Sequence, residues 1–199
     1  MATYTNALQI NQSGKGIPYG GTGEIRADGD ANYGFKNLKG RLDRLAEIPE
    51  LVRDEVLRDL VTSINMTDGA FATVGCASWP VDEERGHRVR GYVEFAFDSA
   101  EHVAGAAAYF PVFFHFDRAL HTQGFADRVH FHWELMMATW VLSDATGFTV
   151  IVTINTDFYP TADEARAAWR RGLDFLAGYL THVPPAGGTP LFTDALNLD

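Results

Sequence analysis

Residues 128–142 read RVHFHWELMMATWVL, and this stretch decides the fold class. Apolar side chains occupy every second position in its first half, which is the period of a strand with one face in a core. The apolar set is Val129, Phe131, Trp133 and Leu135, and the polar set is His130, His132 and Glu134. We therefore expect a sheet whose second face carries two imidazoles and a carboxylate in a row.

The flanking segments extend this pattern into two hairpins. Residues 148–157 follow the turn-forming residues Asp144 to Gly147 and alternate in the same way. Earlier in the chain, residues 70–79 and 88–98 are joined by a polar loop around residues 82–86. In the second of these strands the expected core side chains are Val93, Phe95 and Phe97, and the expected polar side chains are Arg88, Arg90, Tyr92 and Glu94.

Helical spacing dominates three other segments. Residues 38–64 carry an apolar stripe that includes Val52, Val56 and Leu60, and Pro49 suits the first turn of a second helix. Residues 161–164 match a capping box that opens a helix running to about residue 181. Residues 99–122 predict a buried helix kinked at Pro111. The alternative there is a helix ending near Tyr109, followed by a strand.

These elements predict an α+β fold, with an antiparallel sheet of about four to six strands, helices packed on one face and a long C-terminal helix. Residues 38–182 are expected to form a single domain. Residues 1–37 hold seven of the nineteen glycines and are interpreted as an extended arm, with an edge strand at Tyr4 to Ile10 as the alternative. Residues 183–199 are expected to be a tail that docks through Leu191 and Phe192.

Composition excludes several classes of function. The formal charge of −10 opposes binding to phosphate backbones, although Arg85, Arg88 and Arg90 form a local basic cluster. The longest apolar run, residues 103–114, is too short for the ~20 residues that span a bilayer. Cys76 is the only cysteine, so no intrachain disulfide can form. We expect a soluble, cytoplasmic protein with no nucleic-acid or membrane partner.

The C-terminal part resembles a known superfamily. The strand GFTVIVT at residues 147–153, then Tyr159-Pro160 and the helix through Trp169, Leu173 and Leu176, are similar to the closing strand and long helix of START-like helix-grip proteins. The resemblance covers about the last fifth of the chain. It implies a long helix lying across a curved antiparallel sheet, with an apolar cavity for a hydrophobic ligand. No functional residue is carried over from the superfamily.

The polar sheet face is the candidate site. Its expected ligand-binding residues are Tyr92, Glu94, His130, His132, Glu134 and Trp140. Since same-face neighbours on a strand lie ~6.7 Å apart, His130 and His132 can point at one divalent metal ion. A third ligand would come from Glu94, His115, Asp117, His121 or Asp157. Without a metal, a histidine and a glutamate can act as general base and acid, with Tyr92 donating to an oxyanion.

Three classes of function follow from these observations. The first is a domain that binds a small, partly apolar molecule or a protein partner on the polar sheet face. The second is an enzyme that uses the same residues, either on a metal or in acid–base isomerase, cyclase or hydrolase chemistry. The third is a structural protein that forms homo-oligomers, with residues 1–37 wrapped around a neighbour.

Overall fold

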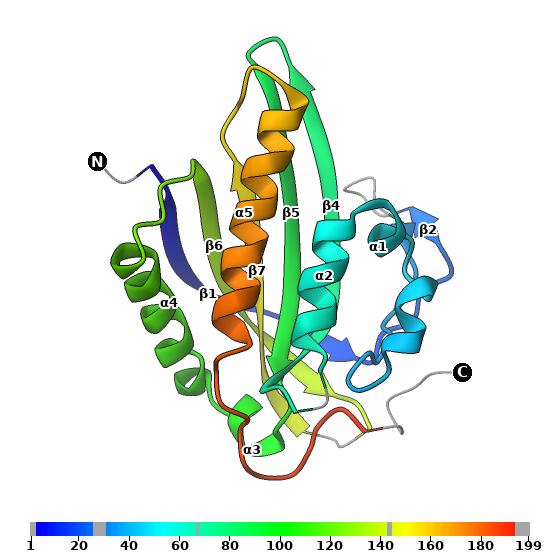
Figure 1. Cartoon of the computed structure of the whole chain (residues 1–199). Helices are drawn as coiled ribbons and strands as arrows, with labels where there is room; N and C mark the ends of the chain where they lie inside the picture. The colour runs from blue at the N-terminus through cyan, green and yellow to red at the C-terminus, as the bar shows by residue number, and fades with distance from the viewer. Residues whose placement is uncertain (1–2, 26–30, 67, 143–144, 194–199) are drawn as a thin grey trace.

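Five strands in the order β1-β6-β7-β5-β4 form the central sheet of the protein (Figure 1). The structure is a computed structural model that describes residues 3–25, 31–66, 68–142 and 145–193. The strands are β1 (Thr5–Ile17), β4 (Phe71–Glu83), β5 (Gly86–Phe97), β6 (Val129–Trp140) and β7 (Ala145–Thr156), and a separate two-stranded ribbon consists of β2 (Glu24–Ile25) and β3 (Ala31–Asn32). The helices are α1 (Pro49–Arg53), α2 (Glu55–Ile64), α3 (Ala100–Val103), α4 (Phe110–Thr122) and α5 (Ala162–Leu180), with short 3₁₀ helices at Leu42–Glu47 and Ala106–Ala108.

The α+β prediction and both hairpins are confirmed. β4 pairs with β5 and β6 pairs with β7, each antiparallel, and β5 pairs with β7 to join the two hairpins. β4 ends later than expected, β5 and β7 begin earlier than expected, and β6 lies within its expected bounds. The turn expected at residues 144–147 falls partly outside the described residues, and β7 already begins at Ala145.

β1 makes the sheet mixed, because it pairs in parallel with β6, with Thr5 opposite His130. Much of the expected arm is therefore an edge strand of the main sheet, which was the alternative for residues 4–10. The domain consequently begins well before residue 38. A bulge between Asn11 and Gly14 lets this long strand follow the bend of β6.

Helices α2, α4 and α5 lie on one face of the sheet (Figure 1). The capping box of α5 is present, with Thr161 and Glu164 bonded reciprocally, so its predicted start is confirmed. Gly172 allows α5 to approach the sheet, because a Cβ atom there would lie 3.1 Å from Val129. Pro49 stands in the first turn of α1 as expected, but Val52 is 68% exposed and lies outside the buried stripe.

Residues 99–122 are helical, as predicted, but they are divided differently. Ser99 caps the short helix α3, and a new helix, α4, begins at Phe110. Pro111 therefore stands in the first turn of α4, where its missing N–H costs nothing, rather than at a kink. The alternative strand from residue 110 is wrong.

The C-terminal tail docks as predicted. Leu191 and Phe192 are both buried, and their backbone N–H groups donate to the carboxylate of Asp98 at 2.9 and 2.8 Å. The ring of Phe192 packs edge-on against Trp140 at a centroid distance of 5.4 Å. The last part of β6 is thus covered on its second face as well.

Candidate functional site on the open sheet face

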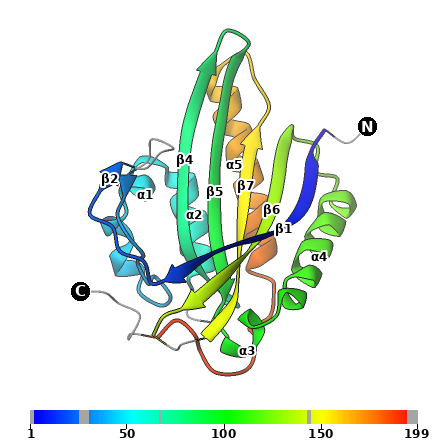
Figure 2. The same cartoon turned by 180° about the vertical axis from the view of Figure 1, so that it is seen from behind.

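No helix of the described residues lies in front of the second face of the sheet (Figure 2). Strand register brings the polar side chains of three strands into rows across this face. The rows are Arg90–Asn155–His130, then Tyr92–Thr153–His132, then Glu94–Ile151–Glu134. The structure therefore brings five of the six expected ligand-binding residues onto one face of the sheet.

His130 is held by two partners from distant parts of the chain. Its Nε2 lies 2.8 Å from Asp157 Oδ1, and its Nδ1 lies 2.9 Å from Thr5 Oγ1. An ionised carboxylate only accepts hydrogen bonds, so the neutral ring carries its proton on Nε2 and its Nδ1 accepts from the Thr5 hydroxyl. Hydrogen bonds therefore connect the hydroxyl of Thr5, the imidazole of His130 and the carboxylate of Asp157 in that order.

The metal prediction gains no support from this geometry. Among the residues that the structure describes, no group of three or more His, Cys, Asp or Glu side chains is placed to hold a metal ion. Of the five residues proposed as a third ligand, Asp157 reaches His130. His115, Asp117 and His121 belong to α4, where Asp117 accepts from Asn6 and His121 contacts Tyr4.

Glu94 is buried and bonded to other parts of the chain, so its carboxylate is not open to a ligand. Its side chain is 2% exposed, forms an ion pair with Lys15 of β1 and accepts a 2.6 Å hydrogen bond from Thr149. Glu134, in the same row, accepts from the side-chain amide of Asn11. Both carboxylates therefore help to attach β1 to the sheet.

Trp140 shares the parity of His130 but does not belong to the open face. It is fully buried, and the ring of Phe192 from the tail packs against it. This burial gives no support to its role as a ligand-contacting residue, which stays a prediction. The alternation of side chains along a strand predicts which face of the sheet a residue is on, but it cannot show which other segment of the chain covers that face.

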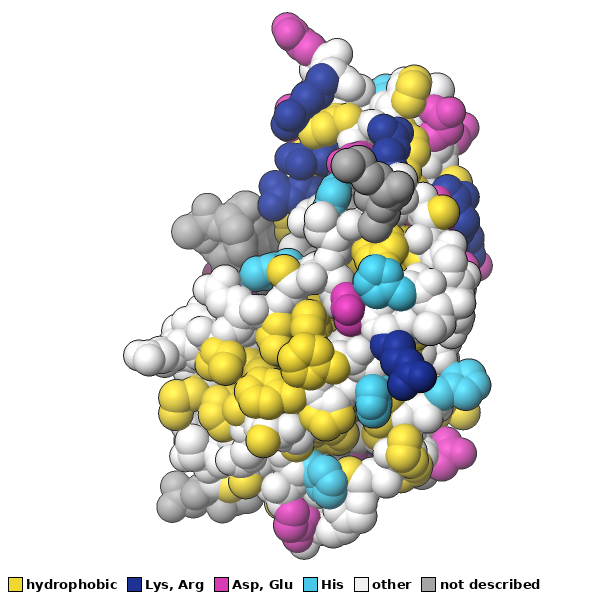
Figure 3. Space-filling model, turned by 90° about the vertical axis from the view of Figure 1, so that its left-hand side faces the viewer, with side chains coloured by type: hydrophobic (Ala, Val, Ile, Leu, Met, Phe, Trp, Pro, Cys, Tyr) yellow, Lys and Arg dark blue, Asp and Glu magenta, His cyan; other side chains and the backbone are white. Residues whose placement is uncertain are grey.

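A hollow of about 360 Å³ opens at the other end of the face, where β5, β6 and β7 meet the loop after β7. Its lining consists of Arg85, Arg88, Arg90, His130, Asn155, Thr156, Asp157 and Phe158. Three arginines and one aspartate lend it a formal charge of +2, in a chain whose total is −10. Figure 3 shows Lys and Arg side chains gathered toward this upper end of the molecule.

Neighbouring groups orient the arginines of this hollow. Arg90 donates from Nε to Asn155 Oδ1 at 3.0 Å. The guanidinium carbons of Arg85 and Arg88 lie 3.9 and 4.6 Å from the ring centroid of Phe158, so the ring lies within cation–π distance of both. The three arginines stood out in the sequence as a basic cluster, whereas nothing local pointed to Asn155, Asp157 or Phe158 as their partners.

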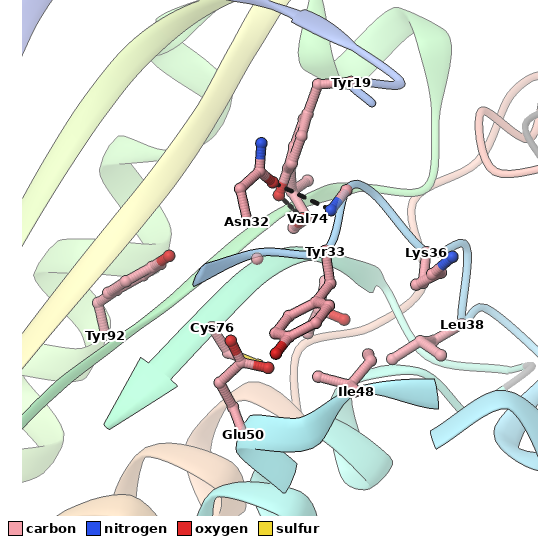
Figure 4. A pocket seen from close by; sticks show the side chains of 13 residues that line it. Tyr19, Asn32, Tyr33, Lys36, Leu38, Ile48, Glu50, Val74, Cys76 and Tyr92 are labelled. Atoms are coloured by element: carbon pink, nitrogen blue, oxygen red, sulfur yellow. Dashed lines mark hydrogen bonds between the residues drawn. The ribbon is translucent and has the colours of Figure 1, made fainter. Parts of the chain in front are cut away.

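A smaller cavity lies at the opposite edge of the sheet, beside β4 (Figure 4). Tyr33 and Glu50 lie beside Cys76 there, and burial raises the pKa of the Cys76 thiol to about 12. A thiol with such a pKa stays protonated and unreactive at neutral pH. The cavity measures about 60 Å³, which admits a few water molecules but no ligand of ordinary size.

A third hollow, of about 430 Å³, lies on the helix side between α4, the end of α5 and the tail. Three histidines, His102, His115 and His182, stand among mostly apolar neighbours such as Val112 and Pro184. Apolar hollows of this size are common ligand sites, so this one is the rival of the open sheet face. Sequence patterns did not indicate it, because its walls come from four separate segments.

Fold and site together define an α+β protein with one helix-covered and one open sheet face. No family model, no curated protein and no solved structure matches the chain. Similarity to START-like proteins therefore stays a prediction. In the described part of the chain, no helix is both long and apolar enough to cross a membrane.

Proposed function

We propose that this protein binds a small molecule on the open face of its sheet, in the hollow beside His130. The observation that carries the proposal is the convergence of polar side chains from β5, β6, β7 and the following loop around about 360 Å³. This volume falls within the ~300–1,000 Å³ of typical ligand sites. Phe158 supplies an apolar wall, which suits a partly apolar ligand.

Rigid elements support the hollow. Arg90, Asn155 and His130 stand opposite one another on three paired strands, and hydrogen bonds join Arg90 to Asn155 and His130 to Asp157. A site whose side chains are already held in place loses little conformational entropy when a ligand binds. The arrangement thus favours ligand binding over a merely solvated polar surface.

A thermal-shift screen of a chemically mixed fragment library, with hits mapped by amide NMR shifts, tests this proposal. We expect hits to perturb residues 88–90, 130 and 155–158, and to weaken in a His130→Gln variant. A His182→Gln variant is the matched control, because His182 lines the rival hollow on the helix side. Hits that respond to His182 and ignore His130 would refute the proposed location.

An enzyme is the second candidate, favoured by the line Thr5–His130–Asp157. In this role His130 Nδ1 takes the hydroxyl proton as Thr5 Oγ1 attacks the carbonyl carbon of an ester, and Asp157 orients the imidazole and stabilises its charge. The C–O bond of the ester then breaks, and the imidazolium gives its proton to the departing alcohol. Water then hydrolyses the acyl-enzyme. An ester-hydrolysis panel tests this: activity must survive Thr5→Ser and vanish in Thr5→Ala, whereas equal rates in both variants would contradict the role.

The metal content of the same preparations tests the remaining prediction that His130 and His132 bind one metal ion.

Cytoplasmic location and homo-oligomer formation stay predictions. Deletion of residues 1–37 no longer tests oligomer formation cleanly, since it would remove β1, whose Lys15 pairs with Glu94 in the sheet. Light scattering on the intact chain is the better measurement. A monomer over a wide concentration range would contradict the oligomer hypothesis.

A further inference from the structure

The guanidinium groups of the hollow outnumber the carboxylates that could neutralise them. Glu83 is shared by two arginines, at 2.9 Å from Arg85 and 3.7 Å from Arg88. Asp157 lies against His130 at 2.8 Å and reaches Arg128 only at 4.0 Å.

Arg90 has no carboxylate partner among the described residues, and its Nε–H is engaged by the neutral amide of Asn155. The Nε of Arg88 is buried and also without a hydrogen-bond partner in the described part of the chain. Arg88 and Arg90 stand two residues apart on the same face of β5, so their like charges repel each other. An anion bound between the two guanidinium groups would relieve this repulsion.

We infer that the ligand of this hollow is an organic anion whose carboxylate or phosphate group is bound by Arg88 and Arg90. This inference rests on the proposed function, since it names the chemistry of the ligand for the same site. The planar guanidinium fork matches the two oxygens of a carboxylate or phosphate, and such charge-assisted pairs are shorter and stronger than neutral hydrogen bonds.

Asn155 and Phe158 position these arginines. The Asn155 amide holds Arg90 by its Nε, so this hydrogen bond does not engage the two terminal nitrogens of that guanidinium. Phe158 packs against Arg88 at 4.6 Å and against Arg85 at 3.9 Å, and its ring supplies an apolar part of the wall of the hollow. The small size of the hollow and the strongly acidic remainder of the chain favour a free small molecule over a polyanion.

The test is an amide and arginine side-chain NMR titration with four probes: benzoate, benzamide, inorganic phosphate and phenyl phosphate. Benzoate and benzamide have nearly the same shape, so they differ mainly in charge. We expect the anions, and not benzamide, to shift the signals of residues 88–90, 130 and 155–158. Binding of benzoate alone assigns a carboxylate ligand and binding of the phosphates alone a phosphate ligand, and either result supports the inference.

Variants separate a built site from general attraction to positive charge. Arg90→Gln is expected to weaken binding about 10- to 100-fold, and Arg90→Lys, which keeps the charge but loses the fork, by less. Arg166→Gln is the control, because it removes the same charge from the exposed side of α5.

Equal binding of benzoate and benzamide at the hollow would overturn the anion assignment and leave the proposed ligand face standing. Anion binding that is unchanged in Arg90→Gln, or that shifts only signals outside the hollow, would also overturn it. The proposed function itself fails only if the mixed fragment screen yields no hit on this face. The two failures are therefore distinguishable.

Discussion

Replacing Lys15 by Met should destabilise the fold, because it leaves the carboxylate of Glu94 buried without its cation. Glu94 is 2% exposed, and among the described residues it retains only the hydrogen bond from Thr149 once Lys15 is changed. Breaking a fully buried pair typically costs about 3–5 kcal/mol. The Lys15 side chain is 28% exposed, so water can partly replace it, and we expect a loss of about 2–3 kcal/mol in the free energy of unfolding.

Urea denaturation followed by circular dichroism measures this loss, and a thermal midpoint lower by about 4–12 °C should accompany it. The double variant Lys15→Met/Glu94→Gln should lose about 1–2 kcal/mol less than the two single variants added together, because it removes both charges. Lys36→Met is the matched control: its partner Glu47 is 3.8 Å away and 44% exposed, so a loss below about 1 kcal/mol is expected. If Lys15→Met behaves like this control and the pair is additive, Glu94 is solvated and open to ligands after all.

Three further predictions concern stability and reactivity. Asp54→Ala should lower the free energy of unfolding, measured by urea denaturation, by about 2–4 kcal/mol, because Asp54 caps α2 and accepts a 3.0 Å hydrogen bond from the buried Trp169 indole. A loss below about 1 kcal/mol would show that water replaces the Asp54 carboxylate. Cys76, whose pKa is raised to about 12 by burial, should resist iodoacetamide at pH 8 in the folded protein and react once unfolded; rapid native alkylation would contradict this environment. Burial lowers the pKa of Lys39 below 10.5, so just below pH 10.5 the unfolded chain binds more protons and stability rises with pH. The free energy of unfolding of the wild type should therefore rise toward pH 10.5 relative to that of Lys39→Met. A difference between the two proteins that stays constant with pH would contradict the lowered pKa.

The elements of this fold could be predicted because their signals are local. A strand period of two and the capping box at Thr161 depend on residues only a few positions apart. The same parity correctly placed five candidate side chains, including Tyr92 and His130, on one face of the sheet. The break before Phe110 appeared only in the alternative prediction, with a strand after it, because Pro111 is compatible with a kink and with a first turn, and only packing decides between them.

The partners of those side chains could not be predicted in the same way. Thr5 and His130 are 125 positions apart, and Lys15 and Glu94 are 79 apart, so no sequence window contains either pair. Both contacts depend on β1 joining β6 in parallel, and the glycine-rich N-terminal sequence indicated an arm at least as well as a strand. Parity likewise could not show that Phe192 would cover Trp140.

The sequence by itself determined the α+β class, the two hairpins, the long final helix and the polar character of one sheet face, because each is encoded in short-range periodicity. Tertiary structure alone decided which polar residues are buried supports, as Glu94 is, and which surround a hollow, as Arg90 and His130 do. The physical reason is that burial and electrostatic pairing depend on segments far apart in the chain, and their approach is set by packing rather than by any local pattern.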